Sequence, residues 1–230
     1  MPAPVIAVDG PAGSGKSSVC RAVADRLGLR YLDTGAMYRA MTWAMLDEGV
    51  DVDDAQAVRA AAAGVRIVSG TDPLAPTIEV DAVDVSVPIR GDEVTAAVSA
   101  VSAVPEVRSA LVELQRAEVE SAVRDGVGIV VEGRDITTVV LPDADVKVFI
   151  TADPAVRAAR RARQDVELGK DDVDVSRTET ALLVRDAKDS SRQASPLTQA
   201  DDAVVIDTTD LTLEQVIETM ASMITRLEHA

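Results

Sequence analysis

A glycine-rich motif near the N-terminus has the residues and spacing of a phosphate-binding loop. Residues 10–17 read G-P-A-G-S-G-K-S and match the pattern G-x-x-x-x-G-K-[ST]. In such a loop the backbone N–H groups surround phosphate oxygens, Lys16 reaches the β- and γ-phosphates, and Ser17 offers its hydroxyl to Mg²⁺. The motif therefore predicts a nucleotide site formed by Gly10, Pro11, Ala12, Gly13, Ser14, Gly15, Lys16, Ser17 and Ser18.

A second segment with the features of an anion site lies at residues 32–39, which read L-D-T-G-A-M-Y-R. It follows a short strand-like piece, so Thr34 is placed to act as the N-cap of a helix, and Arg39 lies just over one turn into that helix. A phosphate at this helix N-terminus would contact both residues. A capped helix without a ligand is the alternative interpretation.

Further arginines and aspartates lie where an anion pocket needs them. Arg134 and Asp135 follow the apolar run 129–131, at the edge of a predicted sheet where open α/β folds bind ligands. Two more groups each share one helix face by their spacing: Arg157, Arg160 and Arg161 in one, and Arg185, Asp189 and Arg192 in the other. The alternatives are a loop ion pair for the first group, a solvated charged face for the second and an intrahelical salt-bridge ladder for the third. The joint occurrence of the three groups with a phosphate loop disfavours these alternatives.

Composition excludes several classes of function. The formal net charge of −16 argues against nucleic acid or anionic membranes as partners but allows small anions. Four of the 23 basic residues are lysine and the others are arginine, whose planar fork suits phosphate and carboxylate. With one cysteine (Cys20) and one histidine (His229), no intrachain disulfide, cysteine-based zinc site or histidine-based triad can form. The chain also has no asparagine, so the guanine-reading N-K-x-D element of GTPases is missing.

The elements that must position these residues follow an α/β pattern. Short apolar runs at residues 4–8, 128–131, 146–150 and 203–206 are typical of strands buried on both faces, and helical patterns separate them. This alternation predicts a parallel sheet with right-handed crossovers and helices on both faces. The first of these helices follows the phosphate loop and ends at Gly28.

Two stretches depart from the simple alternation. Between residues 64 and 105, short β-like pieces separated by Gly, Pro and Asp predict an inserted small antiparallel sheet. Further on, Asp153 and Pro154 begin an arginine-rich helix that leads to an acidic segment, 167–174, expected to be mobile. Residues 176–179 have the spacing of a capping box and predict that another helix opens at Ser176.

Taken together and in order, these motifs resemble the bacterial cytidylate kinases. The matching segments are residues 9–17 (D-G-P-A-G-S-G-K-S), 32–39, 132–135 (E-G-R-D) with 137–144 (T-T-V-V-L-P-D-A), and Arg185 with 192–197 (R-Q-A-S-P-L). The likeness covers nearly the whole chain and includes an insert near 64–105 that is typical of the bacterial form. This combination is far more specific than the phosphate loop alone.

The resemblance implies one P-loop kinase domain over residues 1–230, with a nucleoside-monophosphate-binding insert at about 64–105 and a short lid at about 157–175. It implies ATP with Mg²⁺ as the phosphate donor and CMP or dCMP as the acceptor. Lys16 and the lid residues Arg157, Arg160 and Arg161 would act on the transferring phosphoryl group. The acceptor phosphate would be held by Thr34, Arg39, Arg134 and Arg192, the ribose by Arg185 and Asp189, and the cytosine by Ser99, Arg108 and Asp135.

Two positions depart from the family pattern. Where the family commonly has D-G-R-D-I-G-T, this chain has E-G-R-D-I-T-T, so Glu132 replaces an aspartate and Thr137 replaces a glycine. Glu132 keeps the carboxylate. Thr137 cannot freely adopt a positive φ, which puts the conformation of the loop after Asp135 in question.

Cytosine recognition also has a chemical rationale of its own. The base offers an N4 amino donor beside its N3 and O2 acceptors, so a carboxylate next to a guanidinium matches it, whereas the O4 of uracil would face the carboxylate. Discrimination between CMP and UMP should follow.

We therefore expect a cytoplasmic phosphotransferase that converts ATP and CMP or dCMP into ADP and the diphosphate, by in-line transfer without a covalent intermediate. It would act as a monomer on small-molecule nucleotides, with no nucleic-acid or membrane partner. One alternative is a P-loop kinase for another small acceptor, such as a different nucleotide or a hydroxy acid. The other is a nucleotide-dependent switch or binding module that forms no phosphorylated product.

Overall fold

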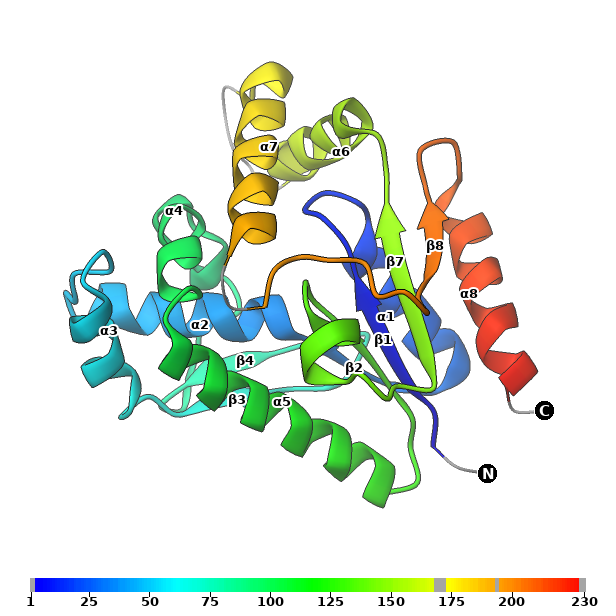
Figure 1. The fold of residues 1–230 in the computed structure, drawn as a ribbon, viewed down its shortest axis with the longest axis horizontal. Helices are drawn as coiled ribbons and strands as arrows, with labels where there is room; N and C mark the ends of the chain where they lie inside the picture. Colours follow the sequence, from blue (N-terminus) through cyan, green and yellow to red (C-terminus); the bar gives the residue numbers. More distant parts are fainter. Residues whose placement is uncertain (1–2, 168–172, 193–194, 228–230) are drawn as a thin grey trace.

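A five-stranded parallel sheet forms the centre of the molecule. The computed structural model describes residues 3–167, 173–192 and 195–227. Its strands are β1 (Val5–Asp9), β2 (Arg30–Asp33), β6 (Ile129–Glu132), β7 (Val146–Thr151) and β8 (Val204–Asp207), in the order β2-β6-β1-β7-β8 (Figure 1). All four neighbouring pairs are parallel. The four strands predicted from apolar runs are confirmed, and the strand-like piece before residue 34 is the fifth.

Helices cover both faces of this sheet: α1 (Lys16–Leu27) and α8 (Leu213–Leu227) pack on one face, and α2 (Thr34–Asp47) and α5 (Pro105–Arg124) pack on the other. The other helices of the described ranges are α3 (Ala55–Ala62), α4 (Asp92–Val101), α6 (Pro154–Glu167) and α7 (Val175–Ser191). A short 3₁₀ turn, Pro88–Arg90, precedes α4, and a π-helical segment, Ile136–Val140, follows β6.

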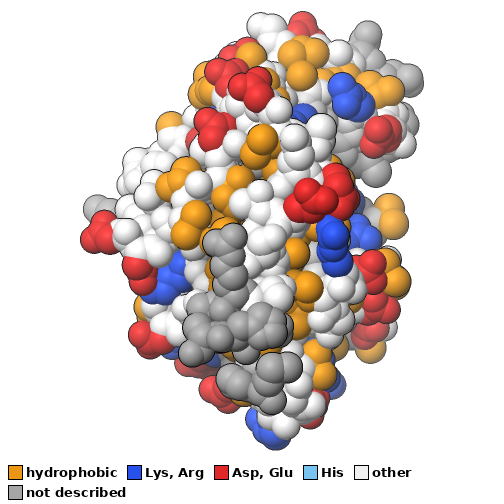
Figure 2. Space-filling view, turned by 90° about the vertical axis from the view of Figure 1, so that its right-hand side faces the viewer, with side chains coloured by type: hydrophobic (Ala, Val, Ile, Leu, Met, Phe, Trp, Pro, Cys, Tyr) orange, Lys and Arg blue, Asp and Glu red, His pale blue; other side chains and the backbone are white. Residues whose placement is uncertain are grey.

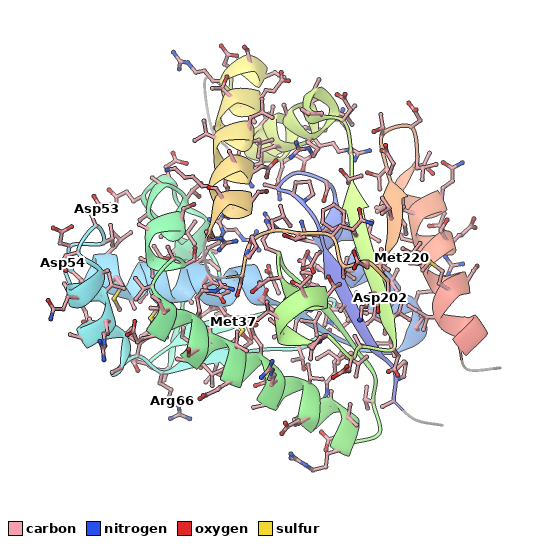
Figure 3. All side chains as sticks on the ribbon, in the orientation of Figure 1. Met37, Asp53, Asp54, Arg66, Asp202 and Met220 are labelled. Carbon is pink, nitrogen blue, oxygen red and sulfur yellow. The ribbon has the colours of Figure 1, made fainter. Side chains whose placement is uncertain are left out.

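Side-chain alternation along β1 divides the core into two clusters. Ile6 and Val8 pack with residues of α1 and α8, whereas Ala7 packs with residues of α2 and α5. Met220 of α8 and Met37 of α2, both labelled in Figure 3, belong to these opposite clusters. The sheet is therefore buried on both faces, which holds the ends of its strands, and the loops after them, in fixed positions.

A second, three-stranded antiparallel sheet lies where the sequence predicted short strands. It consists of β3 (Ile67–Ser69), β4 (Ile78–Val80) and β5 (Val83–Asp84), in that order. The tight β4–β5 turn is made by Asp81 and Ala82, both with positive φ. The buried side chains of β3 and β4 join the α2 side of the core, so this sheet and α4 lie beside the helix that carries Arg39 (Figure 1).

The structure corrects two predicted helix starts. Asp33, not Thr34, caps α2, because its carboxylate accepts the N–H of Ala36 at 3.0 Å. Asp174, not Ser176, caps α7, and accepts the N–H groups of Ser176 and Arg177. In both cases an aspartate one or two residues earlier has the extended backbone that a cap requires.

Part of the acidic segment expected to be mobile, residues 168–172, lies outside the described residues. No helix in the described ranges has the length and apolar character needed to span a membrane.

The packing of α5 supports a stability prediction. Leu111 is fully buried in the α2 side of the core, whereas Leu114, on the same helix, is 39% exposed. Leu111→Ala should lower the free energy of unfolding by about 2–5 kcal/mol, because it removes buried methyl groups and leaves a cavity. Leu114→Ala is the control and should cost less than about 1 kcal/mol. Urea denaturation measures both, and equal losses would contradict the assignment of Leu111 to the core.

Candidate active site

A cavity of about 840 Å³ lies between the phosphate loop, the start of α2, the end of β6 and the helices α6 and α7. The loop residues from Ala12 onward line one side, and the loop before α8 contributes Thr208 and Leu211. The carboxyl ends of β1, β2 and β6 meet here, as expected for a ligand site in an open α/β sheet.

The phosphate loop approaches its neighbours too closely for side chains at key positions. Gly10 has a φ of 146°, and a Cβ there would lie 2.0 Å from the carbonyl oxygen of Ile150 on β7. The loop therefore passes against β7 only because residue 10 is glycine. It then enters α1 at Lys16, which aims the first N–H groups of that helix at the cavity.

Lys16 is buried at the base of the cavity. Its Nζ donates to the carbonyl oxygens of Gly10 at 2.7 Å and Pro11 at 2.8 Å. Burial, and secondarily the charge of Arg134, lowers the pKa of Lys16 to about 7, although the charge of Glu132 opposes that shift. The ammonium is thus held on the loop itself, in a place where an incoming phosphate would favour its charged form.

Glu132, which replaces the family's aspartate, is buried beside the phosphate loop. Its carboxylate accepts a hydrogen bond from the hydroxyl of Tyr31, a residue of β2 that the sequence reasoning missed. Burial raises the pKa of Glu132 and the charge of Asp33 adds to this, whereas Lys16 and a hydrogen bond with Ser17 lower it. Lys16, Ser17 and Glu132 all line the cavity.

Arginines from three separate elements line the cavity. Arg39 of α2, Arg134 after β6 and Arg185 of α7 all line it. Burial, followed by the charges of Arg185 and Arg161, lowers the pKa of Arg39 to about 9. Burial and Arg134 lower the pKa of Arg185 to about 10, and its buried Nε has no hydrogen-bond partner among the described residues. These cations repel one another and would be stabilised by a multiply charged anion.

The arginine cluster is only partly neutralised by protein groups. Asp189 of α7 accepts from the Nε of Arg134 at 3.2 Å and contacts Arg192 at 3.5 Å. Arg39 donates to the carbonyl oxygen of Ile89 at 3.2 Å and the hydroxyl of Thr95 at 3.0 Å, both neutral groups.

The predicted base-reading residues do not line this cavity. Arg108 of α5 and Asp135 form a buried ion pair, and the guanidinium of Arg108 lies 5.3 Å from the ring centre of Tyr38. Ser99 of α4 is partly buried, and its carbonyl oxygen accepts from the hydroxyl of Ser102 at 3.2 Å. The structure thus brings the carboxylate and guanidinium together, while Ser99 has no contact with them in the described residues.

Thr34 also lies off the cavity wall. Its hydroxyl donates to the carbonyl oxygen of Glu132 at 2.7 Å and so joins the start of α2 to the end of β6. The neighbouring Gly35 and Ala36 line the cavity instead. An anion there would meet the backbone of the helix start rather than this side chain.

The three arginines expected to share one face of α6 take different partners. Arg160 donates to the hydroxyl of Thr208 at 2.8 Å and to its carbonyl oxygen at 2.7 Å, and Arg161 pairs with Asp165 at 3.2 Å. Both line the cavity. Arg157 does not, because it is buried against the phosphate loop. Residues 168–172 of the predicted lid lie outside the described ranges.

The loop after Asp135 needs no positive φ at residue 137. Among the described non-glycine residues, only Asp81, Ala82 and Ser195 have one. Thr137 lies in the π-helical segment that starts at Ile136. Its N–H and hydroxyl donate to the Asp9 carboxylate at 2.8 and 2.7 Å. The sequence patterns predicted no role for Asp9.

The fold and cavity define the class of protein: a P-loop kinase core, with a glycine-rich loop opposite an arginine cluster. The chain belongs to the cytidylate kinase family, whose sequence model matches residues 6–226. It is 58% identical to cytidylate kinase of Streptomyces avermitilis, over 97% of this chain and 94% of that protein. It is 51% identical to cytidylate kinase of Nocardia farcinica, over 96% of this chain and 93% of that protein.

The fold is also similar to that of a solved kinase of low sequence identity. An unliganded sugar kinase from Janibacter sp. HTCC2649 matches with a TM-score of 0.51 and 16% identity, over 97% of this chain and 95% of that one. This likeness concerns the fold alone. It agrees with the parallel sheet and helices predicted from the sequence.

The environment of Lys16 predicts proton uptake when a triphosphate binds. At pH 8 a lysine with a pKa of about 7 is mostly neutral, and nearby phosphate charge raises its pKa toward the ordinary value of about 10.4. Binding of Mg·ATP should therefore take up as much as about one proton at that pH. Calorimetry in two buffers of different ionisation enthalpy measures this uptake.

The Lys16→Met variant is the control for that measurement and should take up markedly less. Uptake that is equal in the two proteins would show that another group titrates.

Proposed function

We propose that this chain transfers the γ-phosphoryl group of ATP to CMP and dCMP, giving ADP and the corresponding diphosphates. One observation carries the proposal: a single cavity is lined by a phosphate loop and by three partly buried arginines, of which Arg185 repels both Arg39 and Arg134. Such a cavity suits two phosphorylated substrates placed end to end. Membership in the cytidylate kinase family supports the choice of acceptor.

On the donor side, we propose that residues 10–18 bind the ATP phosphates through their N–H groups, with Lys16 on the β- and γ-oxygens. Ser17 supplies a hydroxyl and Glu132 a carboxylate beside it, and these oxygen donors fit Mg²⁺. The described residues contain no group of three or more His, Cys, Asp or Glu that would hold a metal alone. That is the pattern expected where phosphates and water complete the shell. When bound, Mg²⁺ neutralises charge that develops on the phosphates.

On the acceptor side, we propose that Arg39 and Arg134, which line the cavity, hold the phosphate of CMP together with the backbone at the start of α2 near Thr34. Arg192, which contacts Asp189 and lies off the cavity wall, would join them. Arg185 and Asp189, one turn apart on α7, would contact the ribose. Neutralising the acceptor phosphate lets it approach the γ-phosphate, which carries charge of the same sign.

We propose that cytosine is read by Arg108 and Asp135, which are already paired, with Ser99 joining from α4. Their position off the cavity wall means that the base must enter between α4, α5 and the loop after β6. Movement of the insert that carries α4, residues 64–105, would bring Ser99 toward the base. The same proposal makes residues 157–175 the lid over the phosphates, with Arg160 and Arg161 meeting the transferring group.

We also propose that the chain acts as a cytoplasmic monomer on small nucleotides rather than on nucleic acid or membranes. The net charge of −16 supports the part of this proposal that concerns nucleic acid and membranes, since phosphate backbones and anionic lipids would be repelled. The face seen in Figure 2, where α8 lies, has acidic side chains spread over it and no broad basic area.

The function is tested by measuring ADP release with CMP, dCMP, UMP, AMP and shikimate as acceptors. CMP and dCMP should give fast release that depends on the acceptor. Fast release only with another acceptor would indicate a different P-loop kinase. Slow release that is the same with every acceptor would indicate a nucleotide-dependent switch.

The role of Asp135 predicts a change in base selection. Asp135→Asn keeps the side chain's size and adds an amide donor for the O4 of uracil. The CMP/UMP ratio of kcat/KM should fall by a factor that corresponds to the loss of one base-edge contact, about 1–3 kcal/mol of discrimination. The ratio is the quantity to measure, because the variant also releases Arg108 and lowers activity in general. A parallel loss with both acceptors would make Asp135 a support for Arg108 only.

A further inference from the structure

One residue of the phosphate loop, Ala12, is held through both of its backbone polar groups by side chains of α6 and α7. The N–H of Ala12 donates to Asp186 Oδ1 of α7 at 3.3 Å, and the carbonyl oxygen of Ala12 accepts from Arg157 Nη1 of α6 at 3.1 Å. Asp186 was not predicted to have any role. Both polar groups of Ala12 are thus satisfied by residues far from it in sequence.

The two side chains that hold Ala12 also bind each other. Arg157 and Asp186 form an ion pair whose side chains are 6% and 16% exposed. Arg157 Nε also donates to the carbonyl oxygen of Ala152, just after β7, at 3.1 Å. Within the described residues, this guanidinium donates to the loop, to the segment after β7 and to α7, which fixes its geometry.

The backbone of the loop fits closely against α6 at the next residue. A Cβ at Gly13 would lie 3.0 Å from the carbonyl oxygen of Arg157 and 3.2 Å from its Cβ. The loop and α6 are therefore in backbone contact, so a small displacement of either one must displace the other.

The turn of α7 that contains Asp186 also faces the acceptor side of the cavity. Arg185 precedes Asp186 and lines the cavity, and Asp189 lies three residues later and pairs with Arg134. One helical turn thus contacts the donor loop through Asp186 and the arginine cluster through its neighbours.

We infer that Asp186 and Arg157 are positioning residues that couple the donor site to the acceptor site. A triphosphate in the loop orders the backbone of Ala12, and the hydrogen bonds of that residue with Asp186 and Arg157 then fix the 185–189 turn of α7. CMP consequently meets Arg185 and Asp189 already ordered and loses less conformational entropy on binding. By linkage, CMP tightens the binding of the triphosphate by the same factor. This inference rests on the proposed function.

The test is the affinity for CMP, measured by calorimetry with and without a saturating, non-hydrolysable Mg·ATP analogue. In the wild type the analogue should tighten CMP binding about 10-fold, within the usual range for coupled sites. In Asp186→Ala that factor should fall below about 3-fold, while CMP binding without the analogue changes little. Glu179→Gln, which removes a carboxylate two turns away on the same helix, is the matched control and should keep the wild-type factor.

A second variant separates coupling from folding. Asp186→Ala leaves the buried charge of Arg157 without its partner, which can unfold a protein. The double variant Asp186→Ala with Arg157→Met removes both charges and should lose the coupling to the same extent. Thermal melting of each variant confirms that it is folded.

The possible failures are distinguishable. If the wild type binds CMP but shows no coupling, or if the folded variants keep the wild-type factor, the inference is wrong and the proposed function stands. If the wild type binds no CMP, the proposed function is wrong and the inference falls with it.

Discussion

The carboxylate of Asp9 joins the two halves of the site, and the geometry of the cavity depends on it. Asp9 ends β1, directly before the phosphate loop, and accepts hydrogen bonds from the N–H groups of Ile136 and Thr137 and from the Thr137 hydroxyl. Burial raises the pKa of this carboxyl, while the bonds with Thr137 and Ile136 lower it. These bonds hold the loop that carries Arg134 and Asp135 at a fixed distance from the phosphate loop. Thr137, which departs from the family's glycine, adds a bond that glycine could not make.

The second constraint is an excess of positive charge inside an acidic protein. The chain has a net charge of −16, yet its cavity collects Arg39, Arg134 and Arg185, and Asp189 forms an ion pair with Arg134 of this cluster. Burial and mutual repulsion lower the pKa values of Arg39 and Arg185. Cations placed this way destabilise the free protein, and an anionic ligand relieves that cost. A cluster of positive charge therefore lines the cavity even though the protein as a whole is acidic.

Local sequence determined the sheet and the phosphate loop. Strands buried on both faces need continuous apolar runs, and the loop needs glycine where φ is positive and where the backbone meets β7, so both can be recognised without knowing the rest of the fold. The antiparallel insert was recognisable for a similar reason, because turn residues separate its short strands. The places of Arg39 and Arg134 after strand-like segments, and the helix-face spacing of Arg185, likewise located three residues that line the cavity.

Tertiary structure decided which partner each of those charged side chains takes. Spacing placed Arg157, Arg160 and Arg161 on one side of α6, but a long guanidinium binds whatever acceptor the neighbouring elements present. Arg157 therefore holds the phosphate loop while Arg160 binds Thr208. Asp186 contacts Ala12 across 174 residues of sequence, so no local pattern could reveal it. Sequence determines what is local, namely backbone conformation and apolar periodicity, whereas contacts between distant polar groups exist only after the sheet has brought their helices together.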